Sequence, residues 1–298
     1  MTTRSLSRSR GDLLRLLLAD KRALLSLGYL ALLLIAAVAA PWIAPFSPLD
    51  QDYDHILTAP NALHWLGTDD VGRDILSRLI HGTPASLFSA MFAVGVALVL
   101  GVPVGLVAGY VGGWFDDAVG RVVDTLLSFP AIVLAISVTG ALGISLFNAM
   151  LAIGLVYAPV LARLTRAQTL VAKNELYVDA ARCLGASHAR ILLRHIIPNV
   201  VQPLIVQVTL LLAAALLAEA SLSFLGFGVQ PPAPSWGGML SRAYNYMESS
   251  PWQIYPPGLV ILFTALAFNA LGESLRTLLD PTALKPRRPA LSATSAQA

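Results

Sequence analysis

Six long apolar segments, separated by shorter polar stretches, dominate the hydrophobic pattern of this chain. They span residues 24–44, 86–110, 119–142, 146–161, 200–224 and 257–279. A helix needs about 20 apolar residues to cross a hydrocarbon core roughly 30 Å thick. The fourth segment is the shortest, and we expect it to extend one turn further. The pattern predicts an all-α membrane protein with six transmembrane helices.

The first apolar segment could also be a cleaved signal peptide. Basic residues precede it, and Ala37, Val38 and Ala39 resemble a signal-peptidase site. Its apolar run is longer than the roughly 7–15 residues of a signal-peptide core. We therefore interpret this segment as an uncleaved membrane anchor.

Composition supports the membrane interpretation. The chain is 56% hydrophobic and only 12% charged, whereas soluble domains carry about 25% charged residues. The net charge of +3 could suggest a nucleic-acid partner, but the charges lie between apolar segments and at the chain ends. We expect no nucleic-acid partner. The single cysteine, Cys183, excludes an intrachain disulfide.

The basic residues predict how the chain is oriented. Six spans place both termini on the same side, and all but three of the 20 Lys and Arg residues fall on that side. The positive-inside rule then puts both termini in the cytoplasm. The predicted regions are a cytoplasmic tail (1–22), a first helix with an extracytoplasmic segment (23–85), the main transmembrane domain (86–280) and a second cytoplasmic tail (281–298).

A polar island lies between the fourth and fifth spans. Residues 177–199 read YVDAARCLGASHARILLRHIIPN, which is too polar to cross a bilayer. Its alanines are small enough for a partner surface to approach closely. Gly185 can adopt a left-handed conformation and end a helix, and Pro198 suits the first turn of the next helix. Composition alone would also fit an ordinary basic loop.

The order of residues in this island resembles a known pattern. Asp-Ala-Ala, three residues, Gly185 and then HIIPN is similar to the cytoplasmic loop of ABC-transporter permeases of the binding-protein-dependent import type. The similarity is closest to the dipeptide, oligopeptide and nickel branch, and to its C-type subunit. It continues in HWLGTDDVGRD (64–74), GYVGGW (109–114), AEASLSFLGFGVQPP (218–232) and PSWG (234–237). It covers roughly residues 20–282.

The resemblance implies a type I ABC importer permease fold with a cytoplasmic coupling helix. It implies four kinds of partner: a second, related permease, two cytoplasmic ATP-binding subunits, an extracytoplasmic substrate-binding protein and the lipid of the cell inner membrane. The family's loop is usually Glu where this chain has Asp179, so the carboxylate is kept with a shorter reach. The residues that we expect to dock on the ATP-binding subunit are Asp179, Ala180, Ala181, Arg182, Leu184, Gly185 and Ala186.

The sequence lacks the common catalytic and cofactor-binding motifs. It contains no GxxxxGK[ST] phosphate loop, no HExxH, no GxSxG and no paired-cysteine motif. We expect a transport subunit without cofactor or enzymatic activity, with ATP hydrolysed by its partners. The alternatives are an ion-gradient-driven secondary transporter, a membrane enzyme and a structural anchor. A secondary transporter should show buried charges at mid-membrane, and Glu219 is the one candidate.

Glu219 lies within the fifth apolar segment. An ionisable group inside a span is costly and often functional. We consider two interpretations: Glu219 lines the pore or holds a gate, or it is an interfacial residue near the outer end of the helix.

Three further patterns concern helix packing, the outer segment (residues 46–81) and the loop of residues 226–256. Glycines recur every fourth residue at 101, 105, 109 and 113. This spacing predicts close helix packing, either within the subunit or in a contact that slides during transport.

Six aspartates between residues 50 and 74 match no EF-hand loop. We interpret them as a solvated acidic face rather than a metal site, and we interpret His64 and His81 as isolated structural residues. The aromatic residues of 226–256 suggest a belt at the membrane surface.

Overall fold

A computed structural model describes residues 19–279, and within them the chain is helical with no β-strand. Five of these helices are long and apolar enough to cross a membrane. They are α2 (Lys21–Ile43), α3 (Ile75–Val111), α6 (Leu146–Lys173), α9 (Ile197–Phe224) and α11 (Tyr255–Leu279). Most of the two predicted cytoplasmic tails lies outside the described residues.

The third predicted span is broken rather than continuous. It consists of α4 (Gly113–Ser128) and α5 (Ala131–Leu142), which meet at an angle of 93°. The break falls at Pro130, which lacks a backbone N–H, and Phe129 before it is extended (φ −83°, ψ 141°). The span predicted over 119–142 is therefore formed by two helices rather than by one.

Helices α3 and α6 pack with their backbones in contact. Cβ atoms on Gly101, Gly105 and Gly109 would lie 2.3, 2.2 and 2.8 Å from the carbonyl oxygens of Ala158, Ala162 and Arg166. Residue numbers increase together along this contact, so the two helices run parallel. The α4–α5 pair between them must return the chain across the membrane, which makes it the sixth crossing.

The expected glycine stripe is confirmed for its first three members and wrong for the fourth. Gly113 lies just beyond the end of α3, with φ +63° and no heavy atom within 4 Å of a Cβ built on it. Its neighbour Gly112, with φ +74°, caps α3. These two glycines turn the chain from α3 into α4 instead of packing against α6.

Two spans are longer than the sequence pattern predicted. Helix α3 begins at Ile75, because the Asp74 carboxylate caps it by accepting from the Ser77 backbone N–H at 2.7 Å. The predicted domain boundary at 85/86 therefore lies inside a continuous helix. Helix α6 continues to Lys173, whose Nζ donates to the Gly109 carbonyl at 2.9 Å. This bond ties the end of α6 to the end of α3.

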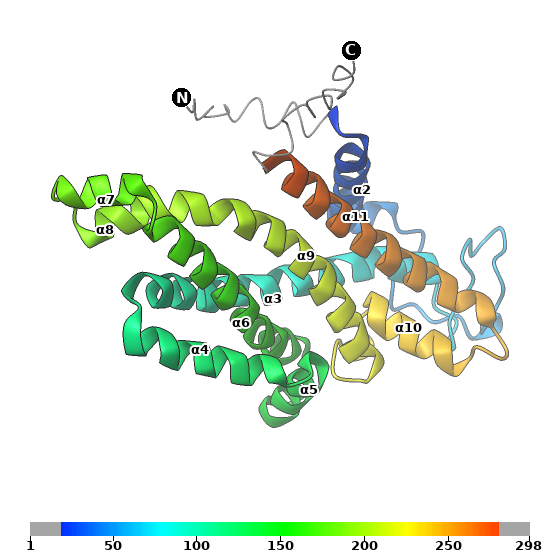
Figure 1. Cartoon of the computed structure of the whole chain (residues 1–298). Coiled ribbons are helices and arrows are strands. Elements are labelled where there is room, and N and C mark those ends of the chain that lie inside the picture. Colours follow the sequence, from blue (N-terminus) through cyan, green and yellow to red (C-terminus); the bar gives the residue numbers. More distant parts are fainter. Residues whose placement is uncertain (1–18, 280–298) are drawn as a thin grey trace, which may run out of the picture.

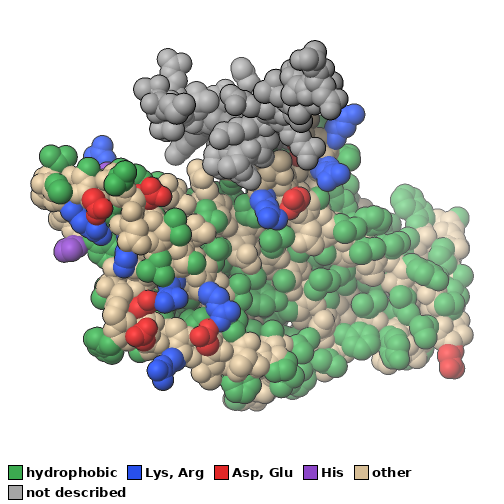
Figure 2. Space-filling view, in the orientation of Figure 1, with side chains coloured by type: hydrophobic (Ala, Val, Ile, Leu, Met, Phe, Trp, Pro, Cys, Tyr) green, Lys and Arg blue, Asp and Glu red, His purple; other side chains and the backbone are tan. Residues whose placement is uncertain are grey.

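Short helices lie at the two opposite ends of the long helices. Helices α7 (Leu176–Cys183) and α8 (His188–Ile191) lie at one end, and α10 (Trp236–Asn245) lies toward the other (Figure 1). In the space-filling view, Lys, Arg, Asp, Glu and His side chains gather over α7, α8 and α4, whereas the surface beyond them is mostly apolar (Figure 2). The α7–α8 end is therefore the polar end of the face seen in this view.

Candidate functional site

Helix α7 is a short helix that ends in a left-handed turn. Gly185 has φ +76°, its N–H donates to the Arg182 carbonyl at 2.9 Å, and the Ala186 N–H donates to the Ala181 carbonyl at 3.0 Å. This is the hydrogen-bond pattern of a Schellman cap. A side chain at Gly185 would be strained, because the left-handed helical conformation costs L-residues about 1–2 kcal/mol. The helix end predicted at Gly185 is confirmed.

Helix α7 has a buried face and an exposed face. Val178 is fully buried and Ala181 is 9% exposed, so both pack toward the rest of the chain. Leu176 and Leu184 are 85% and 87% exposed, although they lie at the polar end of the molecule. Ala181, which we expected at the docking contact, packs instead against the rest of this chain.

The charged pair on α7 remains accessible. The Asp179 carboxylate accepts from Arg182 at 2.8 Å, and both side chains are about half exposed. Exposed ion pairs of this kind contribute about 0–1 kcal/mol, so a partner could replace the pairing at little cost. Ala180, between them, is exposed and small. This face can therefore accept a close, partly charged contact.

Side-chain hydrogen bonds connect the polar end to the spans. The Asn199 side chain at the start of α9 donates to the Tyr177 hydroxyl at 3.0 Å. Partial burial raises the pKa of Tyr177, whose phenol is already protonated at neutral pH. The Tyr110 hydroxyl near the end of α3 lies 2.7 Å from His188 Nδ1 in α8. A displacement of α7 and α8 would therefore reach α3 and α9.

The connection from α8 to α9 includes a π-helical stretch, Leu192–Ile196. Short π-helical segments interrupt the regular ladder and often occur at functional sites. Pro198 lies in the first turn of α9, as expected.

Two ion pairs between α4 and α6 were missed from the sequence. Arg166 forms a bidentate pair with Asp116, with 2.7 Å between Nη2 and Oδ2, and Arg163 pairs with Asp124. Both arginines lie on α6, beyond residue 161, where the fourth predicted span ends. The sequence signal for these two ion pairs was the spacing of Asp116 and Asp124, which lie eight residues apart on α4.

Glu219 is fully buried inside the subunit, near the C-terminal end of α9. Its Oε1 accepts from the Ser223 hydroxyl at 2.7 Å, and its Oε2 has no hydrogen-bond partner. Neighbouring Ala220 contacts α10 closely, since a Cβ on Gly237 would lie 2.6 Å from its Cα. The carboxylate is therefore not in contact with water at a membrane interface in this chain.

The aromatic-belt interpretation is wrong for Trp236. Its side chain is fully buried, and its Nε1 donates to the Leu79 carbonyl at 3.1 Å. It holds α10 against α3. Tyr244 and Tyr255, in contrast, are mostly exposed.

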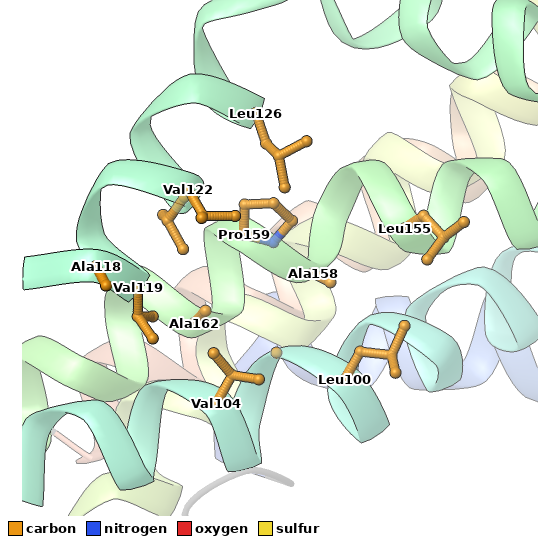
Figure 3. A pocket seen from close by; sticks show the side chains of 12 residues that line it. Leu100, Val104, Ala118, Val119, Val122, Leu126, Leu155, Ala158, Pro159 and Ala162 are labelled. Carbon is orange, nitrogen blue, oxygen red and sulfur yellow. The ribbon is translucent and has the colours of Figure 1, made fainter. Parts of the chain in front are cut away.

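Two cavities lie between the spans. One of about 300 Å³, between α5, α6 and α9, is lined by Ala218 and Ser221 but not by Glu219. The other, of about 380 Å³, lies between α3, α4 and α6. Apolar side chains such as Leu100, Val122 and Pro159 line it (Figure 3). Neither cavity presents a cluster of groups for acid–base or nucleophilic chemistry.

The outer segment is a solvated acidic face only in part, because Asp50 and Asp54 are exposed but two other aspartates are buried. Asp69 and Asp74 are 6% and 3% exposed. Asp69 Oδ2 accepts from Arg73 Nε at 2.7 Å, and Asp74 Oδ1 lies 3.0 Å from His64 Nδ1. The interpretation of these two acids as solvated, and of His64 as isolated, was wrong. Sequence spacing could not reveal these pairs because the loop folds back on itself.

The chain belongs to the binding-protein-dependent transport system inner membrane component family, which matches residues 101–285. Residues 10–60 match the N-terminal TM domain of oligopeptide transport permease C. The chain is therefore a multi-pass permease subunit of an ABC importer. Membership of this family implies ATP-binding subunits and a substrate-binding protein as partners. Membership of this family excludes the alternative of an ion-gradient-driven secondary transporter.

Relatives of known name resemble most of the chain. The dipeptide transport system permease protein DppC of Alkalihalophilus pseudofirmus is 41% identical, over 88% of this chain and 86% of its own. The di/tripeptide transport system permease protein DppC of Pseudomonas aeruginosa is 42% identical, over 88% of each. The glutathione transport system permease protein GsiD of Escherichia coli is 42% identical, over 85% and 84%.

A solved structure shares the fold. The methionine ABC transporter MetNI, in an inward-facing conformation, aligns with a TM-score of 0.55 and 19% sequence identity. The alignment covers 68% of this chain and 97% of the other. This likeness establishes the type I importer permease fold.

Proposed function

We propose that this subunit moves di- or oligopeptides across the cell inner membrane. Its relatives are named for dipeptide, di/tripeptide and glutathione transport, which supports a peptide cargo over nickel or another small solute. It pairs with a second, related permease, and two cytoplasmic ATP-binding subunits and an extracytoplasmic substrate-binding protein complete the importer. The permease supplies the pathway and its partners hydrolyse ATP.

We also propose that the α7 end faces the cytoplasm together with both termini. The concentration of Lys and Arg at this end and in the tails supports this orientation. The segment between α2 and α3 and helix α10 then face outward, toward the substrate-binding protein. In this arrangement the main transmembrane domain predicted over 86–280 begins earlier, with the first turn of α3 at Ile75.

The docking surface for an ATP-binding subunit is the exposed face of α7 with its following turn. The observation that carries this proposal is Leu184, which is 87% exposed at a polar end of the molecule. Exposed apolar groups rimmed by polar residues mark interaction sites. Asp179 and Arg182 add charge, Ala180 allows close approach, and Gly185 with Ala186 shapes the turn.

Transport follows from coupling this surface to the spans. ATP binding closes the two ATP-binding subunits, and α7 follows their motion. The Tyr177–Asn199 and Tyr110–His188 contacts pass the displacement to α9 and α3. The pathway opens toward the substrate-binding protein in one state and toward the cytoplasm in the other, because each state is favoured by different partner contacts.

Glu219 acts at the outer gate in this scheme. It does not line the cavity between α5, α6 and α9, so it acts through Ser223 and the contact of α9 with α10. Its unpartnered Oε2 would gain a hydrogen bond in the other state.

Uptake measurements on the reconstituted importer test the cargo. Proteoliposomes with all subunits should accumulate a labelled dipeptide on addition of ATP and only when this chain is present. Accumulation of nickel chelates without peptide uptake would contradict the peptide assignment.

A further inference from the structure

Three potential metal ligands come together in the outer segment, away from the coupling helix. Asp52, His55 and His64 each offer a ligand atom, and these atoms lie within 4.8 Å of one another. Asp52 caps a single turn of 3₁₀ helix, Tyr53–His55, and His55 Nδ1 at the end of this turn lies 2.7 Å from Asp52 Oδ2. His64 reaches the same place from the other side of the loop, with its ring centre 6.0 Å from that of His55.

His64 is held in the manner of a metal-binding histidine. Its ring is only 3% exposed, and Nδ1 lies 3.0 Å from the Asp74 carboxylate. Its Nε2 has no hydrogen-bond partner. Buried polar atoms are normally paired, so this nitrogen requires an explanation. In metal sites, the second ring nitrogen of a histidine ligand is typically bonded to a carboxylate, which is the role that Asp74 could fill.

The backbone around the three ligands is fixed. A Cβ on Gly72 would lie 1.8 Å from the Asp52 carbonyl oxygen, so the loop following residue 69 packs directly against the Asp52 backbone. The His55 carbonyl accepts from the Thr68 hydroxyl, and the His64 N–H donates to the Asn61 side chain at 2.8 Å. Little further ordering is needed to assemble a site.

Charge also suits a cation. The Asp52 carboxylate supplies an anionic oxygen ligand beside His55, and imidazole and carboxylate groups are ligands that divalent transition metals accept. Tetrahedral zinc with bonds of about 2.1 Å brings its ligand atoms to about 3.4 Å apart. Asp52 and His55 are half exposed, so their side chains can rotate to close the remaining distance.

We propose that Asp52, His55 and His64 bind one divalent transition-metal ion, of which zinc is the representative, with water in the fourth position. Two imidazoles and one carboxylate select such ions over Mg²⁺ and Ca²⁺. Through His64 and Asp74, the ion links the 3₁₀ turn to the first turn of α3. The site is separate from the cargo and from the ATP-binding subunits.

Zinc binding to the purified full chain tests this proposal. The chain is prepared in detergent with an affinity tag that contains no histidine, stripped with EDTA and dialysed against Zn²⁺. Elemental mass spectrometry should find about one zinc per wild-type chain, and competition with a chromophoric chelator gives the affinity. Excess Mg²⁺ should not displace it.

His55→Gln is the variant that removes a ligand, because this half-exposed side chain can change without opening the core. We expect it to weaken zinc affinity at least tenfold while the gel-filtration profile stays the same. Asp54→Asn, in the same turn and outside the cluster, should bind zinc like the wild type. Wild-type chain without stoichiometric zinc would overturn the proposal. So would equal zinc affinity in His55→Gln and the wild type.

Discussion

Gly105 of α3 and the carbonyl of Ala162 in α6 are close enough that a Cβ on Gly105 would lie 2.2 Å from that oxygen. This contact sets the separation of two parallel spans. Because α3 and α6 run parallel, the chain between them must cross the membrane once in the opposite direction. The bent α4–α5 pair is therefore one crossing.

Gly105→Ala should destabilise the subunit. The added methyl group must push α3 away from α6, and overpacking of this kind costs about 1–3 kcal/mol. We expect a lower midpoint in a thermal-stability assay of the detergent-solubilised chain. Gly95→Ala is the matched control, because a Cβ on Gly95 meets no heavy atom within 4 Å. Equal midpoints for the two variants would contradict the packing described for Gly105.

Gly185→Val should uncouple ATP hydrolysis from transport. A β-branched side chain is strained at φ +76°, at a cost of at least about 1–2 kcal/mol, so the turn after α7 changes shape. We expect fewer peptides transported per ATP hydrolysed in the reconstituted importer. Gly120→Val, on α4 with no heavy atom within 4 Å of its Cβ, should keep the wild-type ratio. Normal coupling in Gly185→Val would remove this turn from the mechanism.

Leu184→Ser should weaken binding of the ATP-binding subunits. The substitution removes an exposed apolar side chain from the proposed contact, and truncation of a residue that carries binding energy costs more than about 1 kcal/mol. Co-purification should recover at least fivefold less ATP-binding subunit. Leu63→Ser makes the same change at an exposed leucine of the outer segment. This variant should recover the wild-type amount of ATP-binding subunit. Full recovery with Leu184→Ser would place the contact elsewhere.

Glu219→Gln should reduce peptide uptake without loss of the ATP-binding subunits. The amide keeps the shape and can still accept from Ser223, but it loses the negative charge. Uptake by proteoliposomes should fall at least tenfold. The control is Glu273→Gln, an exposed carboxylate on α11 that pairs with Arg276. Full uptake by Glu219→Gln would show that the carboxylate has only a structural role.

The number of spans could be predicted because membrane crossing demands long apolar segments, and these are visible in the sequence. The bend at Pro130 was missed because hydropathy averaged over a segment does not register a single backbone break. The length of α6 was missed because Arg163 and Arg166 look like loop residues until Asp124 and Asp116 are placed opposite them.

The position of helix α7 followed from residue order, and its glycine cap followed from backbone geometry alone, whereas its role as a coupling helix stays a prediction. Which face of α7 is exposed could not be predicted from a stretch so rich in alanine. The inward position of Ala181 depends on packing against distant helices. The pairing of His64 with Asp74 likewise depends on how the outer loop folds, which no local pattern encodes.

Cys183 offers the most direct test of the central claim that α7 faces the cytoplasm and docks on an ATP-binding subunit. It is the single cysteine of the chain and is exposed at the end of α7. A membrane-impermeant maleimide should label it in inside-out vesicles but not in intact spheroplasts. Co-expression of the ATP-binding subunits should slow labelling at least tenfold, and Leu184→Ser should restore it. Labelling from the outer face, or labelling unaffected by the ATP-binding subunits, would contradict the account.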